Sequence, residues 1–154
     1  MVSMEVKPPV ALGQHGRCTQ LSVFIVDDEP RVREGLKNLL RSMGCQVTGE
    51  GGGGREALTH PELSGSGLVL LDLALGSESG LDLIGPLRAR GLPVLVCSLH
   101  EGTHMIRRAL EAGATGYITK REVATHLRPG LEAVLTGTHY LSPRAAAALE
   151  CNPL

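Results

Sequence analysis

Apolar residues along the chain fall into short runs, and each run is followed by a segment with helical periodicity. The runs are rich in Val, Ile and Leu, which is typical of buried parallel strands, and they predict strands over 21–26, 45–50, 68–71, 94–97 and 116–119. The intervening periodic segments predict helices over about 30–43, 55–61, 81–90, 103–112 and 123–135. Strands that alternate with amphipathic helices imply right-handed crossovers, so we expect an α/β fold in which helices cover both faces of a parallel sheet.

Composition narrows the class of protein. The 154 residues suffice for one domain with tails, and residues 1–20 mix polar residues with Pro and Gly, which indicates a flexible N-terminal extension. The formal net charge is -1 and Lys and Arg are scattered, so no nucleic-acid surface is indicated. The four cysteines show neither CxxC pairing nor metal spacing, which favours reduced, buried thiols. No apolar run has the length of a membrane span.

Polar residues follow four of the five predicted strands. The first strand runs into Asp27 and Asp28, the third into Asp72, the fourth into Ser98 and the fifth into Lys120. Working residues of an open parallel sheet lie at these carboxyl ends, so we expect the five side chains to share one edge. Three carboxylates there would repel one another unless a cation joined them, and Mg²⁺ prefers oxygen ligands of this kind.

This set of side chains suits phosphoryl transfer. A carboxylate beside a divalent cation can attack phosphorus, while a hydroxyl and an ammonium can neutralise the transferred group. Taken singly, each residue has a plainer interpretation: a helix cap for Asp28 or Ser98, a solvated loop acid for Asp72 and a surface lysine for Lys120. The set at four strand ends, in this order, is what favours a functional site.

The sequence around these positions resembles the response-regulator receiver family of the CheY-like superfamily. The matching stretches are Val23–Pro30, Leu70–Leu73 with Gly80 eight residues after the acid, Val94–Ser98 and Ala112–Lys120. The resemblance extends over about residues 21–141. It implies a flavodoxin-like, doubly wound sheet of five parallel strands in the order 2-1-3-4-5.

The same resemblance implies roles for the acidic residues. Asp72 resembles the phosphorylated residue of the family. Asp27 and Asp28 resemble the acid pair that holds Mg²⁺ together with Asp72 and the backbone carbonyl of Ala74.

Further roles follow for the residues at the other strand ends. Ser98 resembles the switch hydroxyl, Lys120 the phosphate-binding lysine, and Tyr117 the aromatic switch residue that changes rotamer when the hydroxyl is drawn to the phosphate. His100 lies near the expected position of the attacking water, where it could tune dephosphorylation, and a solvated loop histidine is an equally good interpretation.

A closer affinity appears in Ser98–Glu101, Gly116–Lys120 and Tyr140–Pro143, which resemble receivers usually fused to a LuxR-type helix-turn-helix DNA-binding domain. Only eleven residues follow Pro143, too few for such a domain. We therefore expect a receiver over 21–137 and a tail or the beginning of a linker over 138–154, with DNA bound only through a domain absent from this chain. Both a stand-alone receiver and a piece of a transcription factor remain open.

The resemblance also implies a function and partners. We expect a two-component response regulator receiver that accepts a phosphoryl group from a sensor histidine kinase and switches a homodimer or output surface on the fourth helix, fifth strand and fifth helix. The protein would be cytoplasmic, without a membrane partner, and a signalling switch rather than an enzyme, with weak autophosphatase activity at most. Two departures from the family are Pro86 and Pro129, which fall inside predicted helices and predict kinks or irregular first turns.

Other functional classes fit less well. An aspartyl phosphatase would need a second acid two residues after the nucleophile, where Ala74 stands, and no Gly-x-Ser-x-Gly elbow is present. The glycines at 51–54 lack the Lys-Ser/Thr of a phosphate-binding loop. His100 and His104 are four residues apart without a third zinc ligand. A degenerate receiver that serves only as a protein-interaction module stays open as the alternative.

Overall fold

A six-stranded parallel sheet forms the centre of the molecule in the computed structural model, which describes residues 21–151. Its strand order is β2-β1-β3-β6-β7-β8, and every neighbouring pair is parallel. The strands are β1 (Ser22–Val26), β2 (Gln46–Gly51), β3 (Leu68–Leu71), β6 (Val94–Ser98), β7 (Gly116–Thr119) and β8 (Tyr140–Leu141). The first five reproduce the predicted order 2-1-3-4-5, which confirms the fold class, whereas the edge strand β8 was not predicted. The predicted extension over 1–20 lies outside the described residues.

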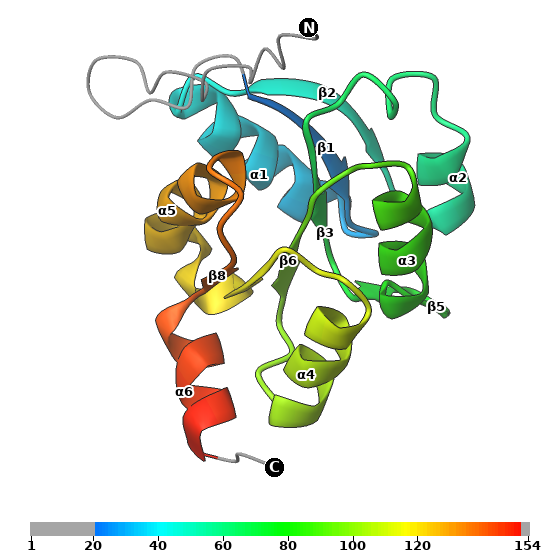
Figure 1. The fold of residues 1–154 in the computed structure, drawn as a ribbon. Helices are drawn as coiled ribbons and strands as arrows, with labels where there is room; N and C mark the ends of the chain where they lie inside the picture. The colour runs from blue at the N-terminus through cyan, green and yellow to red at the C-terminus, as the bar shows by residue number, and fades with distance from the viewer. Residues whose placement is uncertain (1–20, 152–154) are drawn as a thin grey trace, which may run out of the picture.

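Helices cover both faces of this sheet, as expected. They are α1 (Pro30–Ser42), α2 (Gly54–Leu58), α3 (Leu81–Ala89), α4 (Thr103–Glu111), α5 (Val123–Leu135) and α6 (Pro143–Cys151). In Figure 1, α1 and α5 lie together on one side of the sheet, and α2, α3 and α4 lie on the other. A short antiparallel hairpin of β4 (Ala74–Leu75) and β5 (Glu78–Ser79) follows β3, and a 3₁₀ turn, η1 (Lys120–Glu122), joins β7 to α5.

The strands are apolar without interruption because both of their faces are buried. Alternate residues enter two separate clusters: Phe24 and Val26 of β1 join the cluster under α2, α3 and α4, while Val23 and Ile25 join the cluster under α1 and α5. Successive side chains of a strand point to opposite faces, so a sheet covered twice needs an apolar residue at each position. This requirement explains the continuous runs seen in the sequence.

The helix ends and the prolines follow ordinary backbone rules. Pro30 is the first residue of α1, where its missing N–H costs nothing, and Gly44 after the helix has φ of 83°, which favours glycine. Pro86 and Pro129 lie inside α3 and α5, which begin several residues earlier, at Leu81 and Val123. Neither helix therefore begins at its proline, and the expected kinks stay a prediction.

Two of the three cysteines within residues 21–151 are buried in the core. Cys45 and Cys97 are buried, and Cys151 is exposed at the end of α6. Burial raises the pKa of the Cys97 thiol to about 12, so this cysteine remains protonated and unreactive at neutral pH. Within residues 21–151, no helix is long and apolar enough to cross a membrane.

Candidate functional site

Three aspartates meet at the carboxyl edge of the sheet. Val26 of β1 pairs with Leu71 of β3, so the residues that follow, Asp27 and Asp72, emerge side by side. Both carboxylates are buried, with only 1% and 5% of the residue exposed, whereas Asp28 is exposed. One carboxylate oxygen from each of the three lies within 4.8 Å of the others. The structure thus brings together the three acids that the sequence placed at strand ends.

Lys120 lies between the two buried acids. It follows β7, and its Nζ atom is 2.8 Å from Asp27 Oδ2 and 2.9 Å from Asp72 Oδ2. Burial raises the pKa of Asp72, although the ammonium of Lys120 opposes that rise. Burial alone would lower the pKa of Lys120, but its bonds to Asp27 and Asp72 outweigh burial and raise that pKa. Lys120 therefore stays charged and partly neutralises the pair of acids.

Backbone and side-chain donors fix the orientation of the two buried aspartates. Asp27 Oδ1 accepts the N–H of Glu29 at 2.9 Å, and Asp72 Oδ1 accepts the N–H of Ala74 at 3.3 Å. Arg33 of α1 donates to the backbone carbonyl of Asp27 and also pairs with Glu50 of β2. Sequence reasoning missed this arginine because one Arg on an amphipathic helix carries no distinguishing signal.

The donor set fits a hard divalent cation. All three side chains offer carboxylate oxygens, which Mg²⁺ prefers. Asp27 Oδ2 is buried, and the ammonium of Lys120 lies 2.8 Å from it. Among the described residues, no well-oriented hydrogen bond is donated to this oxygen. A buried carboxylate oxygen in this situation has coordination capacity to spare. Asp27, Asp28 and Asp72 are therefore the residues that could hold Mg²⁺, and the expected contribution of the Ala74 carbonyl stays a prediction.

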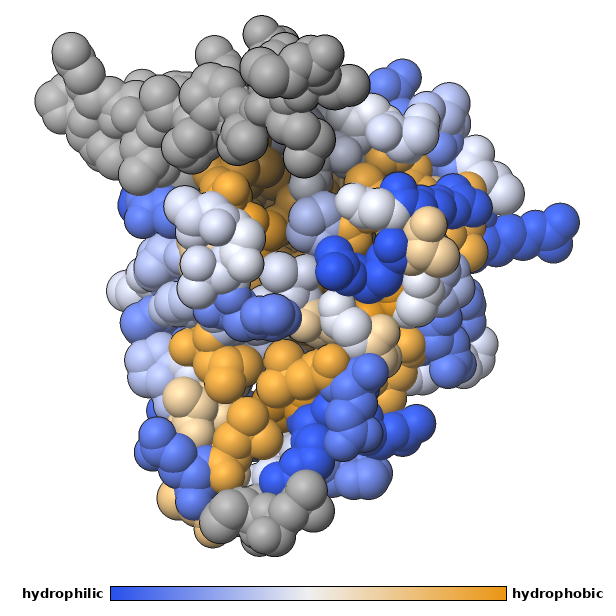
Figure 2. All heavy atoms as spheres, in the orientation of Figure 1, coloured by the Kyte–Doolittle hydropathy of each residue, from blue (hydrophilic) through white to orange (hydrophobic). Residues whose placement is uncertain are grey.

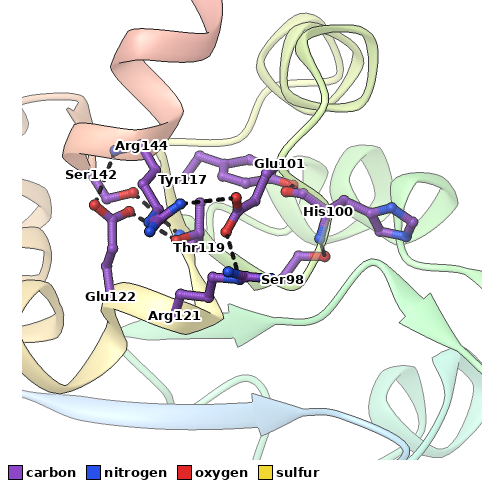
Figure 3. A network of polar contacts seen from close by, with 9 residues as sticks. All are labelled: Ser98, His100, Glu101, Tyr117, Thr119, Arg121, Glu122, Ser142 and Arg144. Carbon is purple, nitrogen blue, oxygen red and sulfur yellow. Dashed lines mark hydrogen bonds and ion pairs between the residues drawn. The ribbon is translucent and has the colours of Figure 1, made fainter.

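Ser98 and Tyr117 lie on neighbouring strands next to these acids. Ser98 is the last residue of β6 and is fully buried, and its Oγ accepts the backbone N–H of His100 at 3.2 Å. The Tyr117 hydroxyl donates to the His100 carbonyl at 2.6 Å, and it also lies within hydrogen-bonding reach of Ser98. Burial raises the pKa of Tyr117 to about 12, so its hydroxyl keeps its proton. The ring of His100 points away from the other side chains drawn in Figure 3.

A glycine lets the chain fold back onto the loop after Asp72. A Cβ atom at Gly80 would lie 2.2 Å from the Asp72 carbonyl oxygen and 2.8 Å from Leu73 Cα. The Gly80 N–H donates to the Leu73 carbonyl at 2.8 Å, which closes the β4–β5 hairpin beside the acids. Position 80 therefore requires glycine for a steric reason, since any side chain there would push the backbone at residues 72 and 73 away.

Comparisons with known proteins agree with this geometry. The family model of the response regulator receiver domain matches residues 23–132. The transcriptional regulatory protein UhpA of Salmonella typhimurium is 35% identical over 130 residues, which cover 84% of this chain and 66% of UhpA. The transcriptional activator protein ExaE of Pseudomonas putida is 34% identical over 136 residues, covering 86% of this chain and 64% of ExaE.

A solved structure shows the same similarity in three dimensions. The crystal structure of a LuxR-family two-component response regulator from Aurantimonas sp. matches with a TM-score of 0.78 and 31% identity, over 84% of this chain and 94% of that one.

The fold and the acidic edge define a receiver of the two-component signalling class. This chain belongs to the response regulator receiver domain family, and its similarity to LuxR-family regulators confirms the predicted affinity. It spans less than two thirds of the length of the curated relatives just described.

Proposed function

We propose that Asp72 accepts a phosphoryl group from a sensor histidine kinase in the presence of Mg²⁺, and that this modification changes the surface formed by α4, β7 and α5. The observation that carries the proposal is the pairing of one ammonium, Lys120, with two buried carboxylates, Asp27 and Asp72, at 2.8 and 2.9 Å. A buried acid whose pKa is raised by its surroundings, beside a fixed cation, is a typical functional arrangement.

The chemistry would proceed by displacement at phosphorus. A carboxylate oxygen of Asp72 attacks the phosphorus of a phosphohistidine, the P–N bond breaks, and the imidazole of the kinase leaves and takes up a proton. When bound to Asp27, Asp28 and Asp72, Mg²⁺ would neutralise part of the charge on the phosphoryl oxygens. Lys120 supplies a second positive charge beside Asp72, and the N–H of Ala74 holds the other Asp72 oxygen.

The phosphorylated form would differ in the positions of Ser98 and Tyr117. The Ser98 hydroxyl accepts the His100 N–H at the strand end, and it could instead donate to a phosphoryl oxygen. Tyr117 lies beside it and would move into the space that Ser98 leaves. This is a shift between two packings of the same residues, for which a bias of a few kcal/mol suffices. His100, exposed next to the site, would tune the lifetime of the aspartyl phosphate.

The biological output would lie in transcription. The similarity to UhpA and ExaE, named as transcriptional regulators, supports a receiver over 21–137 that controls a homodimer or a DNA-binding domain through the segment from residue 138 onward. The protein would act in the cytoplasm as a phosphorylated switch and not as an enzyme, apart from slow autodephosphorylation.

The test is phosphorylation by acetyl phosphate, followed by intact-mass measurement. We expect a labile phosphoryl adduct that requires Mg²⁺ and is absent from the Asp72→Asn variant. Asp82→Asn is the matched control, because Asp82 is an exposed acid in the first turn of α3 and should leave the adduct unchanged. A folded protein that forms no adduct would instead support the interaction-module function.

A further inference from the structure

Helix α6 packs against the surface that the proposed switch would change. Ala145 of α6 is fully buried in the same apolar cluster as Tyr117 of β7 and Ile106 of α4. The Thr103 hydroxyl, at the beginning of α4, donates to the Ala148 carbonyl of α6 at 2.8 Å. Figure 1 shows α6 at the β8 end of the sheet, across from α4. The α4–β7 surface is therefore occupied by the chain's own C-terminal helix.

The first turn of α6 is held by a glutamate from outside the helix. Ser142, which precedes the helix, accepts the Thr119 N–H at 3.2 Å. Glu122 accepts the Arg144 N–H at 2.9 Å through Oε1 and the Thr119 hydroxyl at 2.8 Å through Oε2. The first amides of a helix need an acceptor, and a carboxylate at this end also suits the helix dipole. Glu122 thus joins the end of β7 to the beginning of α6.

A second connection joins α6 to the loop after Ser98. Glu101 Oε2 lies 3.4 Å from Arg121 Nε, and Glu101 Oε1 lies 3.5 Å from Arg144 Nη1. Glu101 follows His100, whose backbone carbonyl accepts a hydrogen bond from the Tyr117 hydroxyl. Figure 3 shows these side chains as one group, in which Arg144 and Ser142 of the α6 end face Glu101, Glu122 and Thr119. Two separate polar connections therefore converge on a single helix turn.

Both connections begin next to residues that a phosphoryl group would attract. Thr119 and Arg121 are the immediate neighbours of Lys120, and Ser98 bonds to the loop that carries Glu101. A shift of Lys120 or Ser98 towards the oxygens of a phosphoryl group on Asp72 would displace the donors and acceptors that hold α6. The Tyr117 ring, which packs in the cluster with Ala145, would leave that position as it followed Ser98.

We propose that α6 is a latch on the α4–β7 surface, closed in the unphosphorylated protein and loosened when Asp72 is phosphorylated. This inference rests on the proposed function. Met105 of α4 and Leu141 of β8 pack partly buried against the cluster that Ala145 enters, and Figure 2 shows apolar atoms gathered where α4 and α6 meet. Opening of the latch would expose more of this apolar surface.

The test is hydrogen exchange of this chain with and without beryllofluoride and Mg²⁺, with adduct formation followed separately by intact mass. We expect the amides of α6 to exchange about fivefold faster or more in the adduct, which is the low end of typical coupling between sites. The amides of residues 36–42, in the second half of α1, serve as the internal control and should not change. An adduct whose α6 exchanges equally or more slowly overturns the latch and leaves the phosphorylation proposal intact, whereas absence of any adduct overturns both.

Variants of the latch provide a second readout in the absence of the phosphoryl mimic. Glu122→Gln should raise α6 exchange in the free protein, while Glu111→Gln, which alters an exposed glutamate at the end of α4, should not. Because coupling is reciprocal, Glu122→Gln should also tighten beryllofluoride binding by a factor similar to the increase in α6 exchange. Unchanged exchange in Glu122→Gln, or weaker beryllofluoride binding by a folded Glu122→Gln protein, would contradict the latch.

Discussion

The ammonium of Lys120 lies 2.9 Å from a carboxylate oxygen of Asp72, a residue 48 positions earlier in the chain. The contact joins the end of β7 to the end of β3 across the intervening strand β6. Lys120→Met should lower the free energy of unfolding by on the order of 2 kcal/mol in EDTA, because two buried carboxylates would face each other without their cation. This loss of stability is smaller than the loss expected for a fully buried ion pair, because 13% of the Lys120 side chain remains exposed to solvent. Mg²⁺ should recover part of the loss, as measured by urea denaturation.

Lys37→Met is the matched control for Lys120. Lys37 also contacts two carboxylates, Glu34 and Glu50, but the Glu34 side chain is 61% exposed and the cluster lies at the surface. Its removal should cost clearly less stability, and Mg²⁺ should not change that cost. Equal losses in the two variants, both insensitive to Mg²⁺, would contradict a special role for Lys120.

Mg²⁺ affinity should depend on Asp28 although this residue is exposed. Asp28→Asn removes one of three clustered carboxylates and should weaken Mg²⁺ binding by about tenfold or more, because ligand charge governs affinity at such sites. The measurement is the rise of the melting temperature with Mg²⁺ concentration, and Asp82→Asn is the control. The same concentration dependence in Asp28→Asn and the parent protein would exclude Asp28 from the metal site.

Gly80 and the helix glycine Gly35 should respond in opposite directions to alanine. Gly80→Ala should lower the free energy of unfolding by about 3 kcal/mol or more, since the new Cβ would clash with the Asp72 carbonyl. Gly35→Ala in the middle of α1 should raise it by about 0.5–1 kcal/mol, because Gly35 is exposed, no atom beyond its own turn lies within 4 Å of the new Cβ, and alanine is the better helix former. Chemical denaturation of both variants tests the close approach, and a neutral Gly80→Ala would refute it.

The strand ends were predictable because they depend on simple patterns. Uninterrupted apolar runs mark strands that are buried on both faces. Such runs are directly followed by polar residues at four strand ends: Asp27, Asp72, Ser98 and Lys120. Because the carboxyl ends of parallel strands lie at the same edge of a sheet, these residues come together there. In the structure, Lys120 contacts both buried acids at this edge. Exposed Asp28 also lies in this cluster, as its position next to Asp27 requires.

The packing of α6 could not be predicted in the same way. The alanines at 145–148 indicate helix propensity, but four identical residues do not mark which face is buried. Pro143 after Ser142 is a signal for a helix beginning, yet the acceptor for the first turn, Glu122, lies on η1, before α5. β8 has only two residues, too short to show any periodicity. These features depend on contacts that are distant in sequence.

The contribution of Glu122 to stability should depend on pH. Burial alone would raise the pKa of this carboxyl, but hydrogen bonds from Ser142, the Arg144 N–H and Thr119 outweigh burial and lower it. A lowered folded-state pKa gives stability that is present above the ordinary glutamate pKa of about 4.3 and is lost as pH falls through the folded-state value. The melting temperature of Glu122→Gln should therefore fall below that of the parent protein at neutral pH, and the difference should shrink below about pH 4. A difference that stays constant with pH would show that the charge of Glu122 does not matter.

Phosphorylation of Asp72, and of no other residue, is tested most directly by identifying the modified residue. Borohydride reduces an aspartyl phosphate to homoserine, so the protein would be treated with acetyl phosphate and Mg²⁺, reduced, digested and sequenced by mass spectrometry. We predict homoserine at position 72 and unmodified aspartate at positions 27 and 28. Homoserine at either of those positions, or at none in a folded protein that binds Mg²⁺, would contradict the account.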